Sequence, residues 1–387
     1  MYARGRTLGK IKIEWWIFGI ALVVNVLFLL LQKVNEGRFF PELAGTDADR
    51  FIPWMELFLE NPVEFFRQNI SSPWYWGYSI LLGVVKIVFQ NVYGVVLIQI
   101  LVHSASVVLL FKIVVEMEGD VRCAVLCALW YCLLFDVISW NRFVLSDSLG
   151  LSLLIFNLYA YIKLMQAPFK SRERAIRWLI LILTMSLIFI ERANAVDCLV
   201  PLTIFLLLNS RRPKRNASVI AALIVIVLVF LFAVPSNGHG LVDRVDKYVV
   251  EFLQGDIMLN RSFSVNQEHL GTPLILVDLL CILGLRIAYF WAPFLKDYSK
   301  LHILLGVVQT LPTIVIGVCG AIFVVKKRLK RYYIFVGVIA SYWVIQSLTE
   351  IDYSYRYRAP IFSSLCVLGT AVLMNIYKTR KEKECVP

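Results

Sequence analysis

Charge and histidine are scarce in this chain of 387 residues, and several common motifs are missing. Only 17% of the residues are charged, and the four histidines share no spacing that suggests a metal site. The chain has neither a GxxxxGKS/T nor a GxGxxG pattern, so no cytosolic nucleotide-binding loop is expected. The eight cysteines lack the spacing of zinc ligands or of paired loops, so we interpret them as small apolar residues that serve packing. These absences argue against an ATP-driven pump, a cytosolic nucleotide-sugar site and a secreted disulfide scaffold.

Apolar residues are in excess. They make up 59% of the chain, and the mean hydropathy is +0.73, whereas a soluble domain is about half apolar. Long apolar runs recur from residue 14 to residue 377, which predicts an all-α polytopic membrane protein with one integral membrane domain over residues 1–387. A soluble enzyme and a disordered regulator are excluded. The net charge of +12 would suggest nucleic acid in a soluble protein. Here the basic residues flank apolar runs and set the topology, so no nucleic-acid partner is expected.

The basic residues form five clusters, at residues 4–12, 170–177, 211–215, 326–331 and 378–383. If all twelve apolar segments crossed the membrane, two clusters would lie outside, against the positive-inside bias. If residues 75–90 and 274–293 do not cross, all five clusters and both termini lie in the cytoplasm. The first segment is short for a crossing, and the second carries Asp278 and Arg286. We therefore predict about 10 transmembrane helices with these two segments as outer-face interfacial helices. The residues alone leave open whether either segment spans.

Two long stretches then lie outside the membrane, the first outer loop at 33–92 and a second outer region at 236–302. Asp47 and Asp49 stand in the first loop, just before an amphipathic stretch at residues 51–66. Such carboxylates either cap the following helix or act as a general base at the membrane surface. Asp147 stands where the apolar segment 146–164 begins. It either caps the helix that starts there or belongs to a functional site.

Charged residues also stand at two further outer turns. Glu191, Arg192 and Asn194 lie between two spans with almost no loop, where a buried charge is costly unless it is paired or faces a wet cavity. A local ion-pair arrangement within that turn is the alternative. Arg356 and Arg358 precede the last span on the outer side, against the positive-inside bias. Because the guanidinium fork donates in two directions, these arginines suit a phosphate ligand.

Five stretches occur in a fixed order along the predicted outer side. They are Asp47-Ala48 with Phe51, Pro73 to Gly94, Leu145-Ser146-Asp147, Arg192-Ala193-Asn194, and Arg356-Tyr357-Arg358-Ala359-Pro360-Ile361. Together they resemble the GT-C superfamily of integral membrane glycosyltransferases, in the branch of protein O-mannosyltransferases and the lipid A aminoarabinose transferase. The resemblance runs over most of the chain and is best in residues 45–208 and 350–365. It departs at Ser72, where some relatives have a lysine, and at Trp74 and Trp76, where a second proline is common.

The resemblance implies a sugar donor linked to polyprenyl phosphate and transfer on the outer face. It implies catalytic roles for Asp47, as the base acting on the acceptor, and for Asp147, which orients the acceptor or binds a metal. It implies that basic residues hold the donor phosphate. The candidates for that role are Arg192, Arg356 and Arg358, and the secondary site candidates are Asp49, Asn194 and Tyr78.

The expected protein is thus an inverting glycosyltransferase of the plasma (inner) membrane, with its active site on the extracytoplasmic face. Its expected partners are the lipid-linked donor, a glycan, lipid or protein acceptor, and membrane lipids. No metal ligands are assigned, although the residues leave a divalent metal open. Two alternatives remain. One is a flippase or transporter of lipid-linked sugars, for which no clear internal repeat is found. The other is a polysaccharide polymerase or ligase, which the basic and histidine residues of 236–302 keep open.

Overall fold

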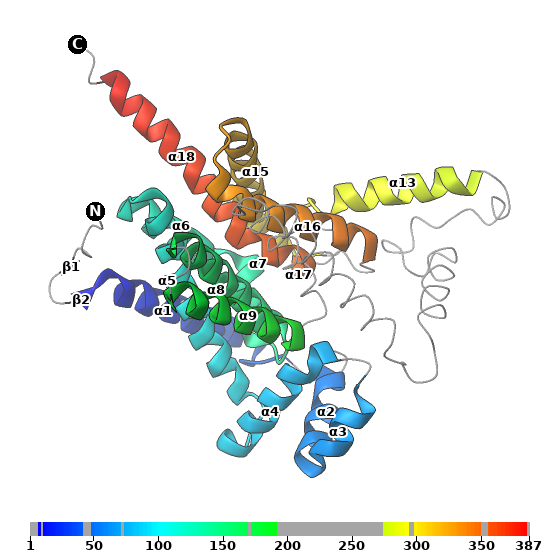
Figure 1. Cartoon of the computed structure of the whole chain (residues 1–387). Coiled ribbons are helices and arrows are strands. Elements are labelled where there is room, and N and C mark those ends of the chain that lie inside the picture. Colours follow the sequence, from blue (N-terminus) through cyan, green and yellow to red (C-terminus); the bar gives the residue numbers. More distant parts are fainter. Residues whose placement is uncertain are drawn as a thin grey trace.

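The computed structural model describes residues 7–8, 11–41, 48–70, 73–168, 172–191, 274–293, 298–349 and 355–384. Within these ranges the chain is helical apart from two short antiparallel strands, β1 (Thr7–Leu8) and β2 (Ile11–Lys12). The predicted all-α class is confirmed. Figure 1 shows the helices gathered into an elongated bundle, with α2, α3 and α4 extending from it as a separate group.

The first half of the described chain consists of helices, and their lengths follow the lengths of the apolar runs in the sequence. In order, these elements are α1 (Ile13–Glu36), α2 (Ala48–Glu60), α3 (Pro62–Gln68), η1 (Pro73–Tyr75), α4 (Trp76–Phe89), α5 (Gly94–Glu118), α6 (Val121–Leu133), α7 (Phe135–Ile138), η2 (Ser139–Arg142), α8 (Asp147–Gln166) and α9 (Arg172–Glu191).

The second described part begins again after residue 273. Its elements are α13 (Leu274–Tyr289), α14 (Lys300–Leu305), the π-helical turn η6 (Gly306–Thr310), α15 (Leu311–Lys326), η7 (Lys330–Tyr332), α16 (Tyr333–Thr349), α17 (Tyr355–Arg358), η8 (Ala359–Ile361) and α18 (Phe362–Glu384).

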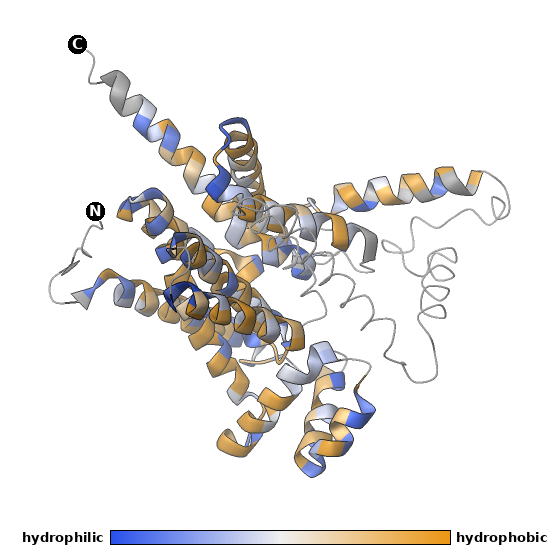
Figure 2. Ribbon diagram, viewed as in Figure 1, coloured by the Kyte–Doolittle hydropathy of each residue, from blue (hydrophilic) through white to orange (hydrophobic). Residues whose placement is uncertain are grey.

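Five helical segments among the described residues are long and apolar enough to cross a membrane: Ile13–Glu36, Gly94–Glu118, Asp147–Gln166, Lys300–Lys326 and Arg356–Thr379. A sixth arises if α6 and the segment Phe135–Arg142 form one span, which is bent by 60°. Figure 2 shows the apolar residues that dominate these helices. The helix over Pro73–Phe89 is shorter, and α13 is not among the candidates, but neither are α9 and α16, which correspond to the predicted spans 177–192 and 332–349; the interfacial assignment of 75–90 and 274–293 therefore stays a prediction. The predicted spans 195–209 and 217–235 lie outside the described residues, so the count of ten stays a prediction.

Close helix packing holds the last span in place. A Cβ atom on Gly317 of α15 would lie 2.5 Å from a side-chain atom of Leu365. One on Gly320 would lie 2.1 Å from the backbone oxygen of Leu368. Helices α15 and α18 therefore meet backbone to backbone, which only glycine allows and which is common between membrane helices.

The charged side chains collect at two ends of the bundle. At one end, Glu118 pairs with Arg331 at 3.4 Å and lies 3.9 Å from Lys378, while Glu116 pairs with Lys163. Arg331 and Lys378 belong to two of the clusters predicted to share the cytoplasmic face. At the other end lie the residues predicted to be outside, including Arg142, which pairs with Glu36 at 2.8 Å. The grouping agrees with the predicted topology, and the sidedness itself stays a prediction.

Candidate active site

Two aspartates are buried at the connection between α6 and α8. Asp136 lies in α7, just after α6, and Asp147 is the first residue of α8. The predicted span 122–140 is not straight. Helix α6 ends at Leu133, and the chain bends by 60° before residues 135–142 form a short second segment. The side-chain Oε1 of Gln309 accepts a hydrogen bond of 3.0 Å from the backbone N–H of Phe135. This contact pairs a backbone donor at the start of the second segment with a side chain of a distant helix.

Buried amide side chains fix this turn to the neighbouring spans. Asn141 donates to Asn25 of α1 at 2.5 Å, and Ser148 donates to Asn141 at 2.5 Å. Gln99 of α5 donates to the carbonyl oxygens of Phe143 and Leu145 at 3.1 and 3.2 Å. Because these donors and acceptors are buried, leaving them unpaired would be costly, and the turn is held in one conformation.

Asp147, the first residue of α8, forms an ion pair with Arg356 across 209 residues of sequence. The arginine Nε lies 2.8 Å from the carboxylate Oδ1. The carboxylate side chain is 1% exposed and the arginine 22%. The guanidinium also lies over the rings of Trp140 and Tyr357, with its carbon 6.0 and 5.7 Å from their centroids. Two residues predicted for the site from opposite parts of the chain thus meet directly.

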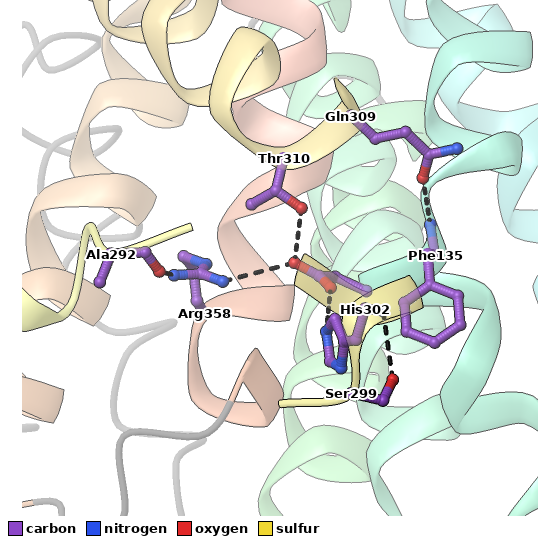
Figure 3. A network of polar contacts seen from close by, with 8 residues as sticks. Phe135, Ala292, Ser299, His302, Gln309, Thr310 and Arg358 are labelled. Atoms are coloured by element: carbon purple, nitrogen blue, oxygen red, sulfur yellow. Dashed lines mark hydrogen bonds and ion pairs between the residues drawn. The ribbon is translucent and has the colours of Figure 1, made fainter. Parts of the chain in front are cut away.

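Asp136 lies at the centre of a second polar cluster. Its Oδ2 accepts from Thr310 at 2.9 Å and lies 3.4 Å from Nη2 of Arg358, and its Oδ1 lies 3.3 Å from Nε2 of His302. Figure 3 shows Thr310 and His302, which lie on one continuous helical span, and Arg358 of α17 converging on one carboxylate. The other terminal nitrogen of Arg358 donates to the carbonyl oxygen of Ala292. Both charges are buried; Asp136 has three polar partners, and Arg358 has two, Asp136 and the carbonyl oxygen of Ala292.

Tyr78 on α4 is fully buried, and its ring packs against Phe51 at 4.8 Å between centroids. Burial raises the pKa of its phenol well above the ordinary value, and the carboxylates of Glu191 and Asp147 add to the effect. Among the described residues, the phenol oxygen has no hydrogen-bond partner. Gly77 brings α4 against the end of α9, because a Cβ there would lie 3.0 Å from Oε2 of Glu191. Helix α4 therefore carries a buried hydroxyl close enough to the end of α9 for the charge of Glu191 to act on it.

Several predicted site residues lie outside the described residues, namely Asp47, Arg192 and Asn194. Asp49 is described and is exposed in the first turn of α2, where a carboxylate complements the helix dipole. The structure brings Asp147 and Arg356 into direct contact, and Tyr78 lies buried on α4, where the carboxylate of Asp147 contributes to its raised pKa. Arg358 lies in the neighbouring buried cluster. In the part of the chain that the structure describes, no group of three or more histidine, cysteine or acidic residues could hold a metal.

Sequence reasoning missed the cluster around Asp136. Asp136 marked only the edge of a short outer turn, His302 was grouped with histidines of no shared spacing, and Thr310 was not singled out. The one available signal was a carboxylate inside an apolar run, Leu133-Leu134-Phe135-Asp136-Val137-Ile138, since such a charge needs a partner.

Fold and site together define a polytopic helical membrane protein that joins carboxylates and guanidiniums of distant segments at one end of its bundle. Residues 75–237 match the model of the family described as dolichyl-phosphate-mannose-protein mannosyltransferase. Among solved structures, the chain is similar to the archaeal oligosaccharyltransferase AglB from Archaeoglobus fulgidus, in complex with an inhibitory peptide and a dolichol-phosphate. The TM-score is 0.54 at 12% identity, and the match covers 96% of this chain and 52% of that chain. A search of curated proteins gives no match.

The chain thus spans about half the length of the solved protein that it matches. The predicted GT-C membrane fold is confirmed by that match. The resemblance to the GT-C superfamily, in the branch that includes protein mannosyltransferases, is confirmed by the family model and the fold together.

Proposed function

We propose that this protein is a membrane glycosyltransferase that transfers a sugar from a polyprenyl-phosphate-linked donor to an acceptor on the outer face of the membrane. The observation that carries the proposal is the Asp147–Arg356 pair, which sets a carboxylate beside a partly exposed guanidinium at the predicted outer end. The family model, described by a dolichyl-phosphate-linked mannose donor, supports the class of donor. The acceptor is a glycan, lipid or protein of the cell envelope.

In the proposed reaction the acceptor hydroxyl oxygen attacks the anomeric carbon of the sugar. Asp47 takes the hydroxyl proton as general base, the bond from the anomeric carbon to the phosphate oxygen breaks, and the lipid phosphate leaves as an anion. A single displacement of this kind inverts the anomeric configuration. Asp147 orients the acceptor, and Asp49, Asn194 and Tyr78 are secondary contributors to the site.

Positive charge stabilises the departing phosphate, because its negative charge grows in the transition state. Arg192, Arg356 and Arg358 provide that charge in the proposal. Of the two that the structure describes, Arg356 is exposed enough to touch a ligand, whereas Arg358 is 5% exposed and acts from behind it. A ligand phosphate would compete with Asp147 for the guanidinium of Arg356, and the released carboxylate would then be available to the acceptor.

The proposed location is the plasma (inner) membrane, with the donor entering sideways from the lipid to an extracytoplasmic site. The predicted topology supports this, because Asp147 and Asp136 stand in a predicted outer turn, whereas Arg331 and Lys378, which pair with Glu118, belong to clusters predicted to be cytoplasmic.

The test is sugar transfer by the purified protein in nanodiscs, using a panel of labelled polyprenyl-phosphate sugars and mixed acceptors. We expect transfer from at least one donor, with loss of activity in Arg356→Ala. Arg331→Ala is the matched control at the opposite end, and it should retain activity. Movement of the labelled lipid between leaflets without transfer would favour a flippase. Growth of a polymer from the lipid-linked sugar would favour a polymerase.

A further inference from the structure

The turn between α6 and α8 is tied to the segment before α18 by two ion pairs rather than one. Asp147 pairs with Arg356, and Asp136 pairs with Arg358. The two arginines lie two residues apart within α17, and the two aspartates lie at opposite ends of one turn. The same two segments are therefore joined twice, once at a partly exposed position and once in the interior.

The inner pair is the more firmly held of the two. Asp136 is 1% exposed and uses both carboxylate oxygens, with Thr310 and His302 as further partners. His302 is itself fixed, because its ring stacks on Tyr298 at 4.1 Å between centroids and its backbone N–H donates to the Ser299 side chain. A buried carboxylate with this many partners has one stable position.

Helix α17 links the position of the Asp136 carboxylate to the position of Arg356. Residues two apart on a helical turn point to different sides, so Arg356 and Arg358 reach separate aspartates from one short segment. Because α17 is a single helical turn, the ion pair between Arg358 and Asp136 sets the rotation of α17 about its axis. That rotation decides where the guanidinium of Arg356 lies.

We infer that Asp136 is a positioning residue for the proposed reaction. Through its ion pair with Arg358 it fixes α17, and α17 places the Arg356 guanidinium against Asp147 and the donor phosphate. The buried carboxylate touches no ligand itself. This inference rests on the proposed function for its link to the donor, while its geometric part concerns only the positions of residues 147 and 356.

The first test measures binding of a polyprenyl-phosphate sugar to the full chain in nanodiscs. Asp136→Asn keeps the side-chain size and removes the charge, and we expect donor affinity to fall by about tenfold, the size of an effect transmitted through one residue. In an Arg356→Ala background the same substitution should cause no further loss, because its effect runs through Arg356. Equal losses in both backgrounds would overturn the inference and indicate general damage to the fold. Asp120→Asn is the control, since this carboxylate caps α6 at its other end and should leave donor affinity unchanged.

The second test needs no donor. In a background without the eight native cysteines, cysteines replace Asp147 and Arg356, and a short bifunctional thiol reagent joins them. Cross-linking should be efficient with Asp136 present and several-fold lower with Asp136→Asn. Equal cross-linking in both would overturn the inference whatever the donor assay gives. Reduced cross-linking in a protein that binds no donor lipid would support the positioning role and refute the proposed function alone.

Discussion

The two arginines of α17 should respond differently to the same conservative substitution. Lysine keeps the positive charge but replaces the planar fork by a single ammonium on a flexible stem. Arg358 uses two nitrogens at once, one toward Asp136 and one toward the carbonyl oxygen of Ala292. Lysine can satisfy only one of these buried acceptors well. We therefore expect Arg358→Lys to lower the free energy of unfolding by about 1–3 kcal/mol, the cost of one unsatisfied buried group.

Arg356→Lys should instead damage function more than stability. Its side chain is 22% exposed, so solvent screens the pair with Asp147 and the stability change should stay below about 1 kcal/mol. Donor binding is different, because hydrogen bonds to charged groups contribute about 1.5–3 kcal/mol each. Loss of one such bond to the phosphate corresponds to a weakening of roughly 10- to 100-fold in donor affinity.

The assay combines thermal unfolding in nanodiscs with binding of a polyprenyl-phosphate sugar, for both variants and the wild type. The reasoning predicts a stability defect in Arg358→Lys and a binding defect in Arg356→Lys. If Arg356→Lys binds donor normally while Arg358→Lys folds normally and loses binding, the two roles are reversed. If Arg356→Lys and Arg192→Lys both bind donor normally, the phosphate site lies elsewhere.

Four further outcomes are expected. Asp47→Asn should reduce sugar transfer by about 10²–10⁴-fold while donor binding persists, and Asp49→Asn should matter much less; the reverse result would mean that the motif is misaligned by two residues. Tyr78→Phe should leave thermal stability nearly unchanged, because the phenol oxygen has no partner among the described residues, yet lower transfer several-fold; full activity would remove Tyr78 from the site. Gly320→Ala should destabilise the protein by about 1–3 kcal/mol through overpacking against Leu368, whereas Gly19→Ala, with nothing within 4 Å, should not. Impermeant thiol reagents should label single cysteines at positions 49 and 354 from outside but not at 172 and 212, while position 137, also predicted to lie outside, is buried and should label poorly; outside labelling at 172 would invert the central spans.

Part of the site was predictable because some charges break a general rule. Asp147 begins an apolar span, and Arg356 carries positive charge to the outer side of the last one. Each exception was visible in the sequence, and the structure joins the two at 2.8 Å. The apolar runs likewise predicted the spans over residues 14–32, 93–115 and 359–377, because length and hydropathy decide whether a helix can cross a bilayer.

The bend at Leu134 was not predictable in the same way. No proline or glycine interrupts the run from Cys127 to Phe135, so the pattern favoured one straight span over 122–140. The break depends on partners that are distant in sequence. Gln309 accepts from the freed N–H of Phe135, and Thr310 and Arg358 bind Asp136 just beyond. Periodicity reports which face of a helix is apolar, but not which polar groups of other helices will meet it.

The two ion pairs of α17 differ in exposure: the Arg356–Asp147 pair is partly exposed, and the Arg358–Asp136 pair is buried. A ligand can exchange with a protein carboxylate only where the guanidinium is accessible and the carboxylate released has somewhere stable to go. Arg356 meets the first condition, because its side chain is 22% exposed, and in the proposed reaction the carboxylate of Asp147 is released toward the acceptor hydroxyl. Arg358 meets neither condition, because it is buried and because releasing Asp136 would leave a buried carboxylate without its guanidinium partner, at a cost of about 3–5 kcal/mol. The inner pair therefore holds α17 in place, and in the proposed reaction the outer pair is where the donor phosphate and the acceptor enter.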